Sequence, residues 1–175
     1  MDSGGIVRRI DELGRIVIPK ELRRTLRLTV GDEMEILSSG ENIVLKKYNK
    51  YGSIKGVVKA VAKSLAQATD ADVVVVDLTS VVVSLGKHKR KLEGLKIGGE
   101  LEKAVALRRE TILHGDDLKG VFENSACDCC YFVFEPITQN GDNFGGMALL
   151  LDTLPSDIAR AYLKFCTELI GASLA

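Results

Sequence analysis

The chain has 175 residues, of which 46% are hydrophobic and 27% are charged, and its 24 Lys and Arg residues balance 24 Asp and Glu residues. This composition is typical of a folded protein and excludes a largely disordered chain, and the length fits one domain or two small ones. No apolar run approaches the ~20 residues of a membrane-spanning helix, and no apolar signal-peptide core begins the chain, so we expect a cytoplasmic protein.

Basic residues are concentrated near the N-terminus although the whole chain is balanced. Residues 8–27 contain seven Arg or Lys residues and three acids. The basic residues are Arg8, Arg9, Arg15, Lys20, Arg23, Arg24 and Arg27. A local excess of positive charge is typical of a nucleic-acid contact, because DNA phosphates attract it. The alternative is a solvated face whose arginines pair with Asp11, Glu12 or Glu21.

Residues 5–50 alternate short β-branched runs with turn residues such as Gly14, Gly31 and Gly40. Runs bounded in this way predict strands. Four short strands are expected, at 6–7, 16–18, 35–37 and 42–45.

A short helix is predicted over 21–26, because Pro19 fits the start of a helix, where its missing N–H costs nothing. Leu22 and Leu26 share one face of this helix, which leaves the arginines on the other. The apolar residues of this half are few, and about 45 residues rarely bury enough surface to fold alone. We therefore expect a homodimer through the N-terminal domain.

Residues 48–53 are polar and rich in turn formers, and the pattern changes after them to helical spacing. We therefore place a domain boundary here. Residues 1–52 are expected to form a DNA-binding domain, and residues 53–175 a sensor and oligomerisation domain.

The second half predicts a domain with an antiparallel sheet flanked by helices, which makes the whole chain a two-domain α+β protein. Helices are expected at 57–66, 98–109 and 158–170. Strands are expected at 72–78, 81–85, 131–137 and 144–151. The first and last helical stripes are long for covering one small sheet, so we expect them also to pair between chains and form a homotetramer.

Three of the four cysteines stand close together, at Cys127, Cys129 and Cys130. This crowding is unlike the spaced framework of a secreted disulfide protein, so reduced thiols are expected. The cysteines can be small buried hydrophobic side chains, or they can form a redox or ligand-binding site. With His114 and Cys166 they can also form a metal site, although the paired Cys-x-x-Cys spacing typical of zinc sites is missing. We predict no bound metal and no cofactor.

Residues 53–175 show no nucleophile–base pattern, phosphate loop or pair of carboxylates, so no enzyme activity is predicted. His88 lies in the basic run 87–91, which is more typical of a solvated loop than of a second DNA contact.

The segment 5–26 reads GIVRRIDELGRIVIPKELRRTL, and it is followed by Gly31-Asp32 and Leu45-Lys46-Lys47-Tyr48. This pattern closely resembles the AbrB-type swapped-hairpin DNA-binding domain of bacterial transition-state regulators. The resemblance implies a dimer whose two chains exchange strand pairs in one small β-barrel and present arginines of both chains to double-stranded DNA. It also implies a tolerant sequence preference, often for AT-rich or bent sites.

Within this resemblance, the DNA-contacting arginines of the family fall on Arg8, Arg15, Arg23 and Arg24. Relatives commonly carry lysine where this chain has Arg9, which keeps the charge but changes the contact geometry. Asp11 and Glu12 are expected to orient Arg8 or Arg15 rather than to repel DNA. Arginine suits the task because its planar guanidinium can bond pairs of phosphate oxygens and the edge of guanine.

Residues 132–137 read FVFEPI, and NGD at 140–142 and FGG at 144–146 follow. This pattern resembles a hairpin of GAF domains. Together with the AbrB-type segment, the resemblance implies a regulator of transition-state or sporulation genes that a small-molecule ligand modulates. One alternative is a cysteine-dependent GAF-type reductase of free methionine sulfoxide, or a redox or metal sensor. Another is an antitoxin that shares the N-terminal fold, although the second half is patterned as a folded domain.

Overall fold

The computed structural model describes residues 5–26, 28, 30, 33–48, 51–86 and 92–174. The chain divides into two units, Met1–Asn49 and Lys50–Ala175. This division precedes the expected 52/53 boundary because Tyr51 packs into the core of the second unit. The predictions for Arg27, for the turn at Gly31-Asp32 and for His88 fall outside the described residues.

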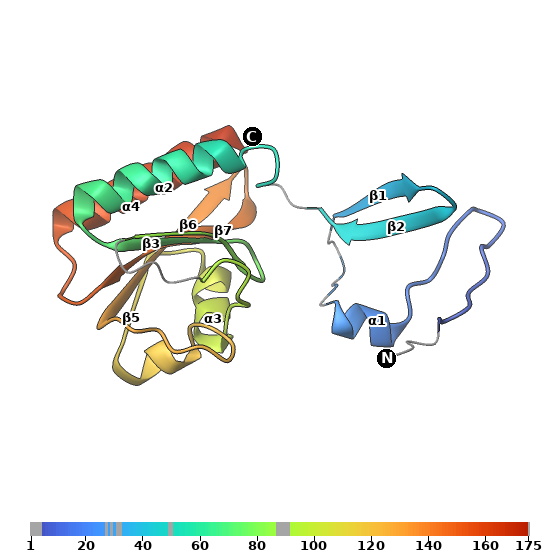
Figure 1. The fold of residues 1–175 in the computed structure, drawn as a ribbon, viewed down its shortest axis with the longest axis horizontal. Coiled ribbons are helices and arrows are strands. Elements are labelled where there is room, and N and C mark those ends of the chain that lie inside the picture. Colours follow the sequence, from blue (N-terminus) through green and yellow to red (C-terminus); the bar gives the residue numbers. More distant parts are fainter. Residues whose placement is uncertain are drawn as a thin grey trace. The chain divides into compact units, whose positions relative to one another are not determined.

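The described part of the N-terminal unit contains one hairpin and one short helix (Figure 1). Strands β1 (Met34–Ser39) and β2 (Asn42–Lys47) pair antiparallel around a turn at Gly40, whose φ of 60° suits glycine. Helix α1 (Lys20–Thr25) directly follows Pro19. The helix and the last two strands therefore form where the sequence predicts them.

The first two predicted strands, at 6–7 and 16–18, are absent from the described residues 5–19. This segment instead runs out and back around a turn, drawn in blue without an arrow in Figure 1. A strand needs hydrogen bonds from a neighbouring strand, and the described part of one chain provides none to these two runs. The prediction was therefore wrong for the single chain.

A five-stranded sheet forms the centre of the second unit, in the order β4-β3-β7-β6-β5 with all neighbours antiparallel. Its strands are β3 (Asp72–Val76), β4 (Val81–Leu85), β5 (Thr111–His114), β6 (Tyr131–Gln139) and β7 (Asp142–Leu151). The sequence predicts four of them. It misses β5, because only two apolar residues of this edge strand stand together, too few for a strand pattern.

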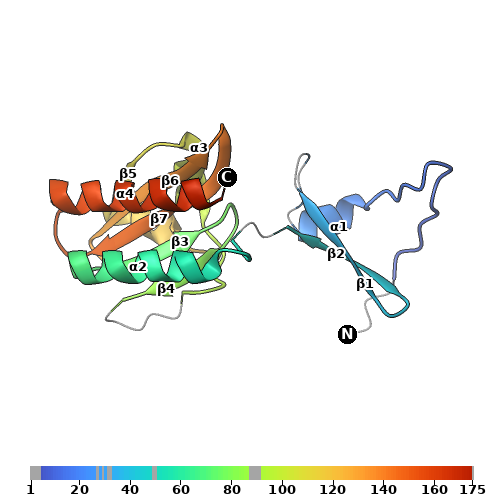
Figure 2. The ribbon, with the colours of Figure 1, turned by 90° about the horizontal axis from the view of Figure 1, so that it is seen from above.

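Helices cover both faces of this sheet. Helices α2 (Lys55–Thr69) and α4 (Asp157–Ser173) lie side by side over one face (Figure 2). Helix α3 (Gly99–Leu107) and the short 3-10 helix η1 (Gly115–Gly120) pack on the other (Figure 1).

Alternate residues of β3 pack into different cores, as strand geometry requires. Val73 and Val75 pack with the residues of α2 and α4, whereas Val74 and Val76 pack with those of α3. None of the helices in the described ranges is long and apolar enough to cross a membrane.

Candidate nucleic-acid interface

The most regular feature of the arginine-rich segment is a turn from Asp11 to Arg15. The Asp11 N–H donates to the Arg15 carbonyl at 3.0 Å, and the Gly14 N–H donates to the Asp11 carbonyl at 2.9 Å. Gly14 has a φ of 76°, which a glycine adopts without a steric penalty. This turn places Arg15 at the start of the returning segment.

The Asp11 carboxylate holds this turn together. Its Oδ1 accepts the N–H groups of Leu13 at 3.0 Å and Arg15 at 2.8 Å, while its Oδ2 accepts the Arg15 Nε–H at 2.8 Å. Asp11 thus bonds to Arg15, as both the predicted orienting role and the alternative of intramolecular pairing expect, whereas Glu12 pairs with no described residue. The Arg15 side chain remains 70% exposed, so its terminal nitrogens stay accessible.

Bonds from the Arg15 backbone and side chain lower the pKa of Asp11 below its ordinary value of 3.8. A lowered carboxyl pKa means that the charged form is stabilised in the folded turn. The contribution is therefore fully present at neutral pH and is lost only as the pH falls through the lowered pKa.

The other predicted arginines are also exposed. Arg23 and Arg24 lie in the last turn of α1, and no acid in the described ranges pairs with them. The Arg8 Nη1 donates to the Val7 carbonyl at 3.3 Å, and Arg9 is exposed nearby. The described part of the N-terminal unit thus presents all five arginines to solvent.

The apolar residues of this unit are exposed as well. Among its described residues Pro19 alone is buried. The large apolar side chains that remain exposed include Ile6, Val7, Ile10, Ile16, Val17, Leu22, Leu26, Ile36, Ile43 and Leu45. One chain therefore supplies the apolar residues of a core without burying them.

Two of the three clustered cysteines are in contact in the second unit. The Sγ atoms of Cys127 and Cys129 lie 3.3 Å apart, and both side chains pack against the core on the α3 side of the sheet. Cys130 is exposed, and burial raises the pKa of the Cys166 thiol within α4. Among the described residues, no group of three His, Cys, Asp or Glu side chains is arranged to hold a metal ion.

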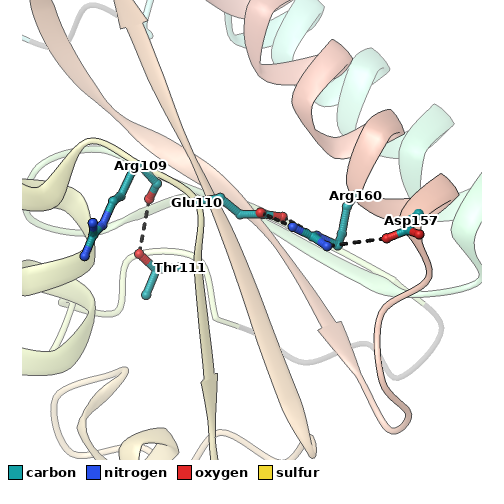
Figure 3. A network of polar contacts seen from close by, with 5 residues as sticks. All are labelled: Arg109, Glu110, Thr111, Asp157 and Arg160. Carbon is teal, nitrogen blue, oxygen red and sulfur yellow. Dashed lines mark hydrogen bonds and ion pairs between the residues drawn. The ribbon is translucent and has the colours of Figure 1, made fainter.

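A polar cleft of about 670 Å³ lies between α4, β6 and the residues that directly precede β5, and the sequence did not indicate it. Arg160 joins Glu110 through two hydrogen bonds, with 2.6 Å between Nε and Oε1, and reaches Asp157 at 3.4 Å (Figure 3). These bonds lower the pKa of Glu110, whereas burial and then the Glu110 carboxylate raise the pKa of Glu135. The cationic and acidic residues that line the cleft balance each other, so it carries no excess charge for one class of ion.

Two family models match successive parts of the chain. The model described as antidote-toxin recognition MazE, bacterial antitoxin, matches residues 7–53, and the model described as stage V sporulation protein T C-terminal, transcription factor, matches residues 53–166. Stage V sporulation protein T of Bacillus subtilis is 33% identical over 155 residues, which are 85% of this chain and 84% of that protein. The transition state regulatory protein AbrB of the same bacterium is 60% identical over 48 residues, 27% of this chain and 50% of AbrB.

Solved structures resemble this chain through the GAF fold. The GAF domain of the nutrient sensor CodY from Clostridium difficile has a TM-score of 0.52 at 14% identity, covering 72% of this chain and 96% of that chain. The type II free methionine-R-sulfoxide reductase from Thermoplasma acidophilum has a TM-score of 0.53 at 16% identity, covering 71% and 94%. At such identities both show the fold alone, and they confirm the predicted GAF-like domain. With its AbrB-like N-terminal segment and its matching C-terminal part, the chain belongs to the family of the transcription factor stage V sporulation protein T.

Proposed function

We propose that the protein binds double-stranded DNA as a homodimer and regulates transition-state or sporulation genes from the cytoplasm. The observation that supports this most directly is the turn at 11–15, in which the Asp11 carboxylate bonds to the exposed Arg15 side chain. Arg8, Arg23 and Arg24 add guanidinium groups to the same unit, with Arg9 as a fifth. Guanidinium groups bind phosphate oxygens strongly and in pairs.

The proposed dimer accounts for the exposed apolar side chains of the N-terminal unit. An apolar surface of this extent is unusual on a monomer and marks a contact site. The partner we propose is the same unit of a second chain, because two copies would provide the unpaired runs at 6–7 and 16–18 with neighbouring strands. Exchange of strand pairs between chains would also bring two sets of arginines to one DNA duplex.

Arginines that contact phosphates respond to the shape and flexibility of DNA more than to its base sequence. We therefore propose a tolerant preference for AT-rich or bent sites.

Replacement of Arg15 by alanine tests the DNA-binding surface. We expect Arg15→Ala to weaken binding to an AT-rich duplex at least about tenfold and to lower the slope of log affinity against log salt by ~0.9 per lost phosphate contact, or about twice that per dimer. Fluorescence anisotropy over a salt series measures both quantities.

Arg109→Ala is the matched control, because Arg109 is an exposed arginine of the second unit. It removes the same charge and should leave the DNA affinity unchanged. Equal effects of the two variants would refute the assignment of the surface to the N-terminal unit.

The second unit, in this proposal, assembles two dimers and transmits a signal. Helix α4 exposes an apolar stripe, and α2 exposes Val57. The stripe consists of Ile158, Tyr162, Phe165 and Leu169. Its helical spacing suits pairing with the same helices of another chain, which would give a homotetramer.

The signal in this proposal is a small-molecule ligand of the GAF-like unit or oxidation at Cys127, Cys129 or Cys130. Either would have to favour one arrangement of the assembly to change the affinity for DNA.

Two other functions are less well supported. The GAF fold of the methionine sulfoxide reductase does not carry its activity across at 16% identity, and this chain adds an arginine-rich unit. A toxin-binding role is suggested by the name of the first family model, but that model matches only residues 7–53. The folded second unit and its family favour transcription regulation over both.

A further inference from the structure

The loop that precedes β6 holds two thiols at contact distance. The Sγ atoms of Cys127 and Cys129 lie 3.3 Å apart, so they must approach by about 1.3 Å to reach the length of an S–S bond. Asp128 alone separates them in the sequence. Both side chains are half-buried against the core, so packing holds them facing each other.

The remaining two cysteines are placed differently. Cys130 is exposed, and its N–H donates to the Leu151 carbonyl at 2.9 Å, which fixes the backbone where β6 begins. Cys166 belongs to α4 and packs with the core on the opposite side of the sheet. The geometry therefore selects one pair among the four thiols.

We propose that Cys127 and Cys129 form a reversible intrachain disulfide, which makes this loop an oxidation site for small peroxides. Cys129 lines a cleft of about 300 Å³ at the end of β7, and in this proposal a small oxidant enters through that cleft. The nearby Asp70, Asp72 and Asp152 also line the cleft and disfavour entry of anionic oxidants. The fitting oxidant is therefore an uncharged peroxide.

The chemistry uses the two thiols and one peroxide. The Cys129 thiol loses its proton, and its sulfur attacks one peroxide oxygen and breaks the O–O bond, which gives a sulfenic acid and a hydroxide that takes up the proton to form water. The Cys127 thiol then loses its proton, and its sulfur attacks the sulfenic sulfur; the hydroxide that leaves takes up this proton as a second water while the S–S bond forms. The two sulfurs together lose two electrons, which reduce hydrogen peroxide to two waters. Two molecules of a low-molecular-weight thiol reverse the oxidation by exchange and leave as their own disulfide.

A disulfide in this loop can affect other elements of the second unit. The Cys130–Leu151 hydrogen bond joins the loop to the end of β7, and the chain then continues into α4. A disulfide between Cys127 and Cys129 would shift the conformation of the connection between β7 and α4. If the proposed function holds, it would thereby change the affinity for DNA.

The test treats the full-length reduced protein with a stoichiometric amount of hydrogen peroxide. We expect loss of two of the four thiols, a mass decrease equal to two hydrogens, and a peptide that carries a link between Cys127 and Cys129. Cys127→Ser and Cys129→Ser should each abolish the link. Cys130→Ser and Cys166→Ser, the matched controls, should retain it, and glutathione should restore all thiols.

Three results would overturn the proposed disulfide: four unchanged thiols, a link that contains Cys130, or a link between two chains. DNA binding is then compared for reduced and oxidised protein, with an expected change of about fivefold or more. An unchanged affinity would remove the regulatory role, whereas failure of the reduced protein to bind DNA would refute the proposed function and leave the thiol result intact.

Discussion

At the scale of single residues, the pairing of Asp11 with Arg15 decides how an arginine is presented. By charge alone an acid is unfavourable in a surface proposed to bind DNA, yet this carboxylate accepts two backbone N–H groups and the Arg15 Nε–H. Such bonds order the arginine in the free protein, so the proposed contact with DNA would cost less side-chain entropy. Asp11 therefore belongs to the candidate site although it contacts no phosphate in our proposal.

Asp11→Asn tests this role. The amide keeps an oxygen that can accept the backbone N–H groups but loses the charged bond to Arg15, so we expect DNA affinity to fall about fivefold, less than in Arg15→Ala. Anisotropy titrations of both single variants and of the double variant measure the coupling.

Asp116→Asn serves as the control, because Asp116 forms a comparable exposed ion pair with Lys119 in the second unit. Strictly additive effects of Asp11→Asn and Arg15→Ala would contradict the positioning role.

At the scale of elements, Tyr51 ties the start of the second unit to its sheet. Its side chain is 2% exposed, and its hydroxyl donates to the Phe144 carbonyl of β7 at 2.8 Å. Burial, with a further contribution from Asp77, raises the pKa of Tyr51, so the hydroxyl keeps its proton at every physiological pH. The residue just after the unit boundary is thereby part of the sheet's own core.

Tyr51→Phe should lower the free energy of unfolding of the second unit by about 1 kcal/mol, because it removes a buried hydrogen bond and leaves the ring in place. Urea denaturation followed by circular dichroism measures the change. Tyr48→Phe is the comparison, since Tyr48 is exposed, and it should have no effect. If both variants were equally stable, Tyr51 would not anchor this boundary.

At the scale of the whole molecule, the two units leave different surfaces for assembly. The N-terminal unit exposes the residues of an entire small core, whereas the second unit has its own buried cores and exposes an apolar stripe on α4 together with scattered apolar side chains. A core of its own lets the second unit fold without a partner. The first contact is therefore expected to be obligate and the second to depend on protein concentration.

Phe165→Glu tests the second contact. A charge in the middle of the exposed stripe should convert the proposed tetramer into dimers, because an unpaired carboxylate is costly to bury. Light scattering coupled to size exclusion, over a range of protein concentrations, measures the assembly. Ala161→Glu, which adds the same charge on the polar-cleft side of α4, should leave the tetramer intact.

Two results would contradict this view of the assembly. A wild-type protein that stays dimeric at all concentrations would exclude the tetramer. A folded monomer of residues 1–52 would exclude the strand exchange.

The sequence by itself determined the helices, most strands and the two-domain α+β class, because apolar periodicity and turn residues are local signals. It also placed the five arginines, since exposed charge follows from local composition. The strands at 6–7 and 16–18 did not form, because strand pairing depends on a neighbour that the described part of one chain does not provide.

Only the tertiary structure decided which distant residues meet. Tyr51 and Phe144 are 93 residues apart in the chain, and Glu110 and Arg160 are 50 apart. No local pattern reports such contacts, because they depend on how strands are ordered in the sheet. The cysteines show the same limit: their spacing allowed three interpretations, and only the packing of the loop against the core brought Cys127 to Cys129 and left Cys130 exposed.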